Sequence, residues 1–199
     1  MRTGILGGTF NPPHLGHLHA AQLAREALGL DRVLFIPTNL PPHKSLPAGS
    51  ATTAQRCDMV RRLIAQAPWA RLDTLEIDRG GASYTVDTLR ALHERGEREL
   101  YLIIGTDMLL TFEHWREPEE IARLTRLAVC AREGEDWTVL EHKAAQLRRS
   151  MNAKVELVRG ESLTISSTEL RQGGVLRRYT PPAVADYIEQ NHLYGYENI

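Results

Sequence analysis

The sequence contains only two cysteines, Cys57 and Cys130, among its 199 residues. They lie far apart, in helix-like and strand-like surroundings, and form no C-x-x-C pair. A disulfide scaffold or a cysteine-based zinc site would need more cysteines at closer spacing. We therefore interpret both as reduced residues that pack in the core.

An excess of basic charge is also missing. Lys and Arg total 24 against 25 for Asp and Glu, which gives a formal net charge of -1. A protein that binds a polyanion such as duplex DNA usually carries a basic excess. We therefore expect no nucleic-acid partner, and phosphate groups would be bound only at a local site.

Long hydrophobic runs are absent as well. The N-terminus leads directly into TGILGG, without the apolar segment of a signal peptide, and no later stretch is long enough to span a membrane. We expect a cytoplasmic protein with no membrane partner. Whether it forms a homo-oligomer is left open, because no exposed apolar stripe stands out.

Short apolar runs alternate with longer segments whose apolar residues recur every three or four positions. This pattern predicts strands joined by crossover helices, that is, an α/β fold with a doubly wound parallel sheet. Several runs are apolar almost throughout, as in strands that are covered on both faces. The expected strands lie at residues 4–6, 32–37, 71–77, 100–105, 126–131 and 154–158.

Three interior helices are expected from their apolar faces, and a fourth near the C-terminus. The interior faces are formed by Leu18, Ala21, Ala24 and Leu28, by Met59, Val60, Leu63, Ile64 and Ala67, and by Val86, Leu89 and Leu92. In TPPAVADYIEQNHL, Thr180 is expected to cap a helix with Pro181 in its first position, packed on the sheet edge. The stretches 37–53 and 132–137 are rich in turn-forming residues and predict loops.

The stretch GILGGTFNPPHLGHLHAA at residues 4–21 stands at the first junction between strand and helix. In an open parallel sheet, ligands bind at the carboxyl ends of strands where the strand order reverses. Gly7 and Gly8 would let the backbone approach a ligand, and a helix from about Gly16 would offer free N–H groups. His14 and His17 are spaced so that both imidazoles can face one anion near the helix start.

Other interpretations of this stretch stay open. Neither the dinucleotide fingerprint G-x-G-x-x-G nor the P-loop G-x-x-x-x-G-K-[ST] is present, so the glycines alone are a weak signal. A zinc site of His14, His17 and His19 would match no familiar spacing, and no Glu accompanies the pair as in H-E-x-x-H. We expect no metal site, and His19 should point elsewhere on the helix. A purely structural role for His14 and His17 is the remaining alternative.

A second polar stretch, ISSTELR, occupies residues 165–171. Ser166 and Glu169 fit a capping box, so a helix is expected to start here with N–H groups that can bind an anion. Arg171, about one turn later, could add a forked cation to the same phosphates. An ordinary capped surface helix is the alternative.

The two stretches carry a resemblance to a known family. GGTFNPPHLGH resembles the signature G-x-F-[DN]-P-x-H-x-G-H of the nucleotidylyltransferase superfamily, and ISSTELR resembles its I-S-S-T-x-x-R element. IPTNLPPHK, SYTVDTL, IIGTDMLLTFEHW, CARE and YIEQNHLYG are similar to bacterial nicotinate mononucleotide adenylyltransferases. The resemblance covers essentially the whole chain and implies a Rossmann-like nucleotidylyltransferase fold with C-terminal helices, as one domain over residues 1–199. Asn11 stands where many members carry Asp, and we expect no change in activity from it.

The reaction that the resemblance implies is transfer of the adenylyl group of ATP to nicotinate mononucleotide. It yields nicotinate adenine dinucleotide and pyrophosphate in NAD biosynthesis, with Mg²⁺ carried on the triphosphate. The attacking phosphate, with a second pKa of about 6, is already mostly dianionic near neutral pH, so no general base is required. This agrees with the lack of a nucleophile elbow in the sequence.

The resemblance also implies roles for individual residues. Catalysis would involve His14, His17 and Arg171. ATP would be bound by Gly8, Thr9, Phe10, His14, His17, Gly105, Asp107, Arg132, Ile165, Ser166, Ser167 and Arg171. Nicotinate mononucleotide would be bound by Thr9, Lys44, Ser83, Tyr84, Thr85, Asp107, Trp115 and Arg116.

In this interpretation Trp115 stacks on the pyridinium ring. Backbone N–H groups near Thr85 and Arg116 bind the nicotinate carboxylate, which disfavours an amide. A core position for Trp115, a solvated loop position for Lys44 and a surface position for Arg132 are the alternatives. For the whole chain, a phosphopantetheine adenylyltransferase, a non-catalytic nucleotide sensor and a zinc-binding structural protein are the competing hypotheses.

Overall fold

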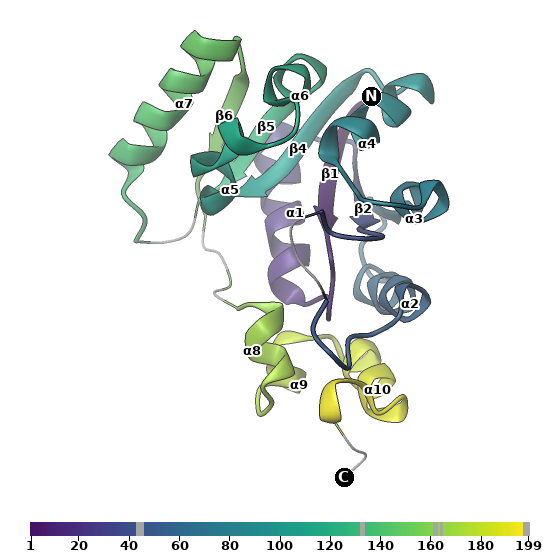
Figure 1. Ribbon diagram of the computed structural model, residues 1–199. Helices are drawn as coiled ribbons and strands as arrows, with labels where there is room; N and C mark the ends of the chain where they lie inside the picture. Colours follow the sequence, from purple (N-terminus) through teal and green to yellow (C-terminus); the bar gives the residue numbers. More distant parts are fainter. Residues whose placement is uncertain (43–45, 132–133, 161–162, 164, 197–199) are drawn as a thin grey trace. The chain divides into compact units, whose positions relative to one another are not determined.

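The computed structural model describes residues 1–42, 46–131, 134–160, 163 and 165–196. Strands and helices alternate along most of the chain, as the periodicity predicts (Figure 1). The elements are β1 (Arg2–Gly8), α1 (Leu15–Leu28), β2 (Arg32–Pro37), α2 (Thr53–Leu63), β3 (Ala70–Leu72), α3 (Leu75–Arg79), α4 (Thr85–Glu94), β4 (Glu99–Gly105), α5 (Thr106–Leu110), η1 (Phe112–His114), α6 (Pro118–Leu124), β5 (Arg126–Cys130), α7 (Trp137–Met151), β6 (Lys154–Val158), α8 (Ser167–Arg171), α9 (Leu176–Tyr179), α10 (Pro182–Gln190) and η2 (Leu193–Gly195).

The strands form one six-stranded sheet in the order β3-β2-β1-β4-β5-β6. Strand β4 pairs in parallel with β1 and β5, and β5 pairs in parallel with β6. The interiors of β2 and β4 are buried almost throughout, as expected for strands covered on both faces. The predicted α/β class with a parallel sheet is confirmed, and the strand order reverses between β1 and β4.

The expected strand at residues 71–77 is wrong over most of its length. Strand β3 ends at Leu72, and α3 begins at Leu75. The side chain of Asp73 accepts a hydrogen bond from the Leu75 N–H at 3.0 Å, which closes a turn before the helix. Such local bonds compete with strand pairing, and here they override the apolar pattern.

The chain divides into two compact units. The first unit comprises residues 1–6, 20–34 and 84–162, and the second comprises residues 7–19, 35–83 and 163–199. In the first unit α7 packs along β6 and against α5, and in the second unit α10 packs on α2 (Figure 1). A single domain over residues 1–199 stays a prediction.

The C-terminal helix differs in detail from the expectation. Helix α10 begins at Pro182, with Pro181 in the N-cap position, so Thr180 does not cap it. The Thr180 hydroxyl instead donates to the Leu176 carbonyl at 2.8 Å, at the end of α9. We expected the helix on the sheet edge, and the element it packs on is α2.

Both cysteines are buried and free, which confirms their interpretation as reduced core residues. Burial raises the pKa of the Cys57 thiol, and it raises the pKa of the Cys130 thiol to about 12. Neither side chain is therefore a thiolate near neutral pH. In the described part of the chain, no helix has the length and apolar character needed to cross a membrane.

Candidate functional site

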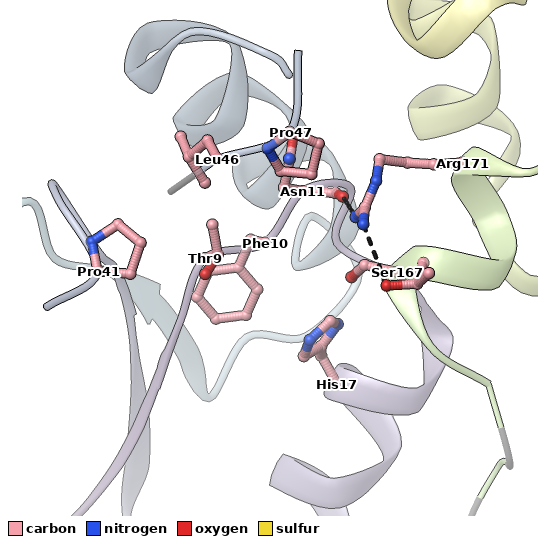
Figure 2. Close-up of a pocket in the computed structure, with 10 residues that line it drawn as sticks. Thr9, Phe10, Asn11, His17, Pro41, Leu46, Pro47, Ser167 and Arg171 are labelled. Carbon is pink, nitrogen blue, oxygen red and sulfur yellow. Dashed lines mark hydrogen bonds between the residues drawn. The ribbon is translucent and has the colours of Figure 1, made fainter. Parts of the chain in front are cut away.

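A cavity of about 560 Å³ in the second unit brings the two polar stretches together (Figure 2). We call residues 7–17 the first motif and residues 165–171 the second motif. The cavity is lined by Thr9, Phe10, Asn11, His17, Pro41, Leu46, Pro47, Ser167, Thr168 and Arg171. Two segments separated by most of the sequence thus line one cavity, beside the carboxyl end of β1 and the first turn of α1.

The backbone between β1 and α1 has an unusual conformation at Phe10. Its φ of 50° lies in the left-handed region, which costs a bulky residue about 1–3 kcal/mol. The ring is 2% exposed, and its centroid lies 4.9 Å from that of His17 and 6.0 Å from that of Phe35. This packing helps to hold the strained residue in place. Such strain is frequent where a loop is shaped for a ligand.

The glycines of the first motif differ from one another. A Cβ added to Gly7 would meet no atom of the described residues within 4 Å, whereas at Gly8 it would lie at ordinary distance from the Phe10 ring, 3.5 Å. A Cβ on Gly16 would meet His14 Nδ1 at 2.9 Å and Ile165 at 3.2 Å. Gly16 therefore permits the close approach of the second motif to the start of α1. The sequence pattern did not predict this role for Gly16.

The two histidines lie together, but only His17 lines the cavity. Their ring centroids are 3.8 Å apart, and the His14 backbone N–H donates to His17 Nδ1 at 3.2 Å. Desolvation, with the His14 imidazole as a second cause, holds the pKa of His17 well below its ordinary value. A neutral ring whose Nδ1 accepts a hydrogen bond carries its proton on Nε2. His17 can therefore donate to an anion without being charged.

His14 is 6% exposed, and its Nδ1 is buried with no hydrogen-bond partner among the described residues. Burial lowers its pKa from 6.5 to about 4, although the nearby charge of Glu169 acts in the opposite direction. His14 is neutral at pH 7. Its backbone orients the His17 ring, and its own side chain does not line the cavity.

The lowered pKa of His14 predicts acid sensitivity. Between pH 6.5 and about 4 the unfolded chain binds a proton at this residue that the folded protein does not bind. Above pH 6.5, protonation of His14 therefore does not change the free energy of unfolding. As the pH falls below 6.5, this residue lowers the free energy of unfolding by up to about 3 kcal/mol, at roughly 1.4 kcal/mol per pKa unit. Urea unfolding from about pH 7.5 to about pH 4.5 should show a smaller loss in His14→Gln than in the wild type. Parallel loss in both proteins would contradict the assignment.

The second motif is fastened to the first by side-chain hydrogen bonds. The predicted capping box is confirmed, because the Glu169 N–H donates to the Ser166 hydroxyl and the Ser166 N–H donates to the Glu169 carboxylate. The Ser167 hydroxyl donates to the Pro12 carbonyl at 2.8 Å. The Arg171 guanidinium donates to the Asn11 carbonyl at 2.6 Å and to the Thr168 hydroxyl at 3.0 Å (Figure 2).

Arg56 is a residue that sequence reasoning missed. It lies on α2 with no exposed surface, and its guanidinium donates to the carbonyls of Thr9 and Thr38, each at 2.7 Å. Burial lowers its pKa from the ordinary value. The side chain joins the loop after β1 to the loop after β2. The signal in the sequence is an arginine on the apolar face that also carries Met59, Val60 and Leu63.

The residues expected around the pyridine ring lie mostly in the first unit. Tyr84 is the N-cap residue of α4, and the Arg116 guanidinium lies over its ring, 4.4 Å from the centroid. Trp115 is partly exposed, and its ring centroid lies 5.4 Å from that of Phe112. Trp115 is therefore not a fully buried core residue. Thr85 is the first residue of α4.

The remaining residues that were expected to bind the nucleotides lie at several other places in the chain. Ser83, in the second unit, is buried, and its hydroxyl accepts from the Asn39 N–H at 3.0 Å. Asp107 lies in the first turn of α5, and a Cβ on Gly105 would meet no atom of the described residues within 4 Å. Lys44 and Arg132 lie outside the described residues.

We looked for side chains that could together bind a metal ion in the part of the chain that the structure describes. No group there of three or more His, Cys, Asp or Glu residues could hold a metal ion. The zinc-binding hypothesis for His14, His17 and His19 would need such a group.

Comparison with known proteins agrees in family and in fold. The family model described as cytidylyltransferase-like matches residues 5–173. Probable nicotinate-nucleotide adenylyltransferases from Synechococcus sp. (strain JA-3-3Ab) and Roseiflexus sp. (strain RS-1) are 44% and 43% identical. They match 97% and 96% of this chain, over 94% and 96% of their own lengths. A solved structure, Plasmodium falciparum nicotinic acid mononucleotide adenylyltransferase complexed with NaAD, has a TM-score of 0.80 over 98% of both chains at 19% identity. At that identity the structural likeness concerns the fold alone.

Proposed function

The chain belongs to the nicotinate-nucleotide adenylyltransferases of the cytidylyltransferase-like family, and we propose that it transfers the adenylyl group of ATP to nicotinate mononucleotide. The products are nicotinate adenine dinucleotide and pyrophosphate, and the reaction belongs to NAD biosynthesis. The observation that carries this proposal is the cavity lined by both motifs, with His17 and Arg171 on its wall.

Catalysis in this proposal depends on placing two polyanions together. A 5′-phosphate oxygen of the mononucleotide attacks the α-phosphorus of ATP in line, and the bond to pyrophosphate breaks with its electron pair on the leaving oxygen. Near neutral pH the attacking phosphate is mostly dianionic, so no side chain has to remove a proton. The chain supplies orientation and hydrogen-bond donors for the charge that spreads over the transferring group.

His17 and Arg171 are the side chains proposed to touch the phosphates. The neutral His17 ring would donate through Nε2, and the Arg171 fork would add a full positive charge. The backbone N–H groups of Thr9 and Phe10 would act beside them, and Gly8, Ile165, Ser166 and Ser167 keep the ATP contacts that the family resemblance implies. His14 is assigned a positioning role, since its N–H orients the His17 ring.

Mg²⁺ is proposed to enter with ATP. The described residues provide no group of three metal-ligating side chains, so the ion would be held mainly by phosphate oxygens, as is usual for this cation. Magnesium neutralises charge on the triphosphate when it is bound.

The acceptor would be recognised by the residues that the family resemblance implies. Trp115 would stack on the pyridinium ring, and the N–H groups of Thr85 and Arg116 would bind the nicotinate carboxylate. The Arg116 guanidinium over the Tyr84 ring adds positive charge beside the first turn of α4, which favours an acid over an amide. Ser83, Asp107, Gly105, Lys44 and Arg132 keep the nucleotide contacts that the family resemblance implies. A single domain and a cytoplasmic location belong to this proposal, and oligomeric state is a matter for measurement.

The proposal predicts which acceptor is used. Pyrophosphate release with ATP and Mg²⁺ should be fast with nicotinate mononucleotide and at least about tenfold slower with nicotinamide mononucleotide, because the amide nitrogen presents donors to donors. Phosphopantetheine, measured in parallel, should give no release above background. Preference for phosphopantetheine would contradict the assignment of Trp115 and Thr85. ATP binding without release from any acceptor would favour the nucleotide sensor.

A further inference from the structure

The last turn of the described chain, η2, and its C-cap residue Tyr196 contact both motifs through tyrosine hydroxyl groups. Tyr194 donates to Asn11 Oδ1 at 2.7 Å, and Tyr196 donates to the Leu170 carbonyl at 2.6 Å. We propose that these two residues, which we call the tyrosine clasp, position the two motifs for the triphosphate of ATP. The inference rests on the proposed function and adds positioning residues to it.

Asn11 connects one end of the clasp to the cavity wall. The residue is 2% exposed, and its Oδ1 also accepts from the Ala51 N–H at 3.3 Å. Its Nδ2 donates to the Ser50 hydroxyl at 2.8 Å, and its carbonyl accepts from Arg171. A shift of Asn11 would therefore move the guanidinium that is proposed to bind phosphate.

Ser50 extends this connection to a further residue of the cavity wall, Pro47. Its hydroxyl accepts from Asn11 and donates to the Pro47 carbonyl at 2.7 Å. Pro47 lines the cavity. Asn11 thus links the Tyr194 hydroxyl to the arginine through its own backbone carbonyl, and to the proline through its side chain and Ser50.

Backbone strain indicates why this link is needed. Phe10, the residue before Asn11, has a φ of 50°. In the C-terminal segment that carries the clasp, His192 and Tyr194 have φ values of 51° and 58°. Residues in this region persist only where their surroundings over-determine them. The hydrogen bond from Tyr194 to Asn11 restrains two strained segments together, so its loss would let Phe10 relax away from the cavity.

The other end of the clasp holds the second motif. Leu170 is fully buried and directly precedes Arg171, and its carbonyl accepts from Tyr196. Burial also raises the pKa of the Tyr194 hydroxyl, so it stays a protonated donor at neutral pH. Neither tyrosine lines the cavity, so the clasp acts on ATP through Asn11 and Arg171.

The test is Tyr194→Phe, which removes only the hydroxyl oxygen. Tyr187→Phe is the matched control, since that hydroxyl donates to Asp58 of α2, at 3.4 Å. We expect the Kd and KM for ATP to rise about three- to tenfold in Tyr194→Phe, with the KM for nicotinate mononucleotide unchanged. Tyr187→Phe should leave both values at the wild-type level, and both variants should melt close to the wild-type temperature.

Several outcomes would overturn the clasp. One is that Tyr194→Phe binds ATP as tightly as Tyr187→Phe does. Another is that Tyr194→Phe raises the KM for both substrates equally and also lowers the melting temperature. Tyr196→Phe gives a second and independent reading, with the same selective rise expected. Direct titration with ATP tests the clasp separately from the proposed adenylyl transfer. If the wild type binds ATP but forms no dinucleotide, the proposed function fails, while a selective loss of ATP affinity in Tyr194→Phe still supports the clasp.

Discussion

His17→Ala is expected to lower the turnover number by about 100- to 1000-fold while leaving the protein folded. Loss of one preorganised donor to a developing anion has an effect of this size in other enzymes. The His17 ring lines the cavity and is held by the His14 N–H, so its removal takes away an oriented donor. Steady-state kinetics with saturating ATP and nicotinate mononucleotide, beside a circular dichroism melt, measures both parts of the prediction.

The matched control is His19→Ala, two residues further along α1 and outside the cavity lining. It should retain near wild-type turnover. His17→Asn keeps a side-chain donor and should fall between the wild type and His17→Ala. Wild-type turnover in a folded His17→Ala protein would remove the phosphate role assigned to this residue.

Arg56→Met is expected to lower the free energy of unfolding by about 3 kcal/mol. Its guanidinium satisfies the carbonyls of Thr9 and Thr38, and hydrogen bonds from a charged donor contribute about 1.5–3 kcal/mol each. Relief of the buried charge offsets part of that loss. Because Thr9 lines the cavity, ATP affinity should also fall. Urea unfolding and ATP titration provide the two measurements.

Arg61→Met on the same helix is the control for this substitution. The Arg61 side chain is 58% exposed and pairs with Asp58 over one helical turn, so its removal should change stability by about 0.5 kcal/mol or less. Arg56→Lys keeps the charge without the fork and should be intermediate. Equal stability of the Arg56 and Arg61 variants would show that the guanidinium is not what joins the two loops.

Periodicity predicted most of the fold because β2, β4 and β5 are buried almost throughout and therefore appear in the sequence as apolar runs. β6 matches the expected range at both ends, and β2 does as well. The failure at residues 73–77 has a local cause, since the side chain of Asp73 turns the chain where the apolar residues alone indicate a strand. Capping is equally local, and so Ser166 and Glu169 were identifiable from their spacing.

The contacts that shape the site could not be predicted in the same way. The guanidinium of Arg56 bonds to carbonyls 47 and 18 residues away, and the hydroxyl of Tyr194 bonds to a side chain 183 residues away. No local pattern encodes such partners. Asn11 shows the difference most clearly: the sequence marks it as a neutral exchange for Asp, yet its Nδ2 donates to Ser50, which a carboxylate could not do. The expectation of unchanged activity for that exchange stays a prediction.

The central claim is that the α-phosphorus of ATP is transferred to the phosphate of nicotinate mononucleotide. It is tested most directly by following ATP labelled separately at the α and γ phosphates through one reaction with the purified protein and Mg²⁺. The α label should appear in nicotinate adenine dinucleotide and the γ label in pyrophosphate, in equal amounts. Release of the γ label as inorganic phosphate with the α label in ADP, or release of pyrophosphate with the α label in AMP, would contradict the account.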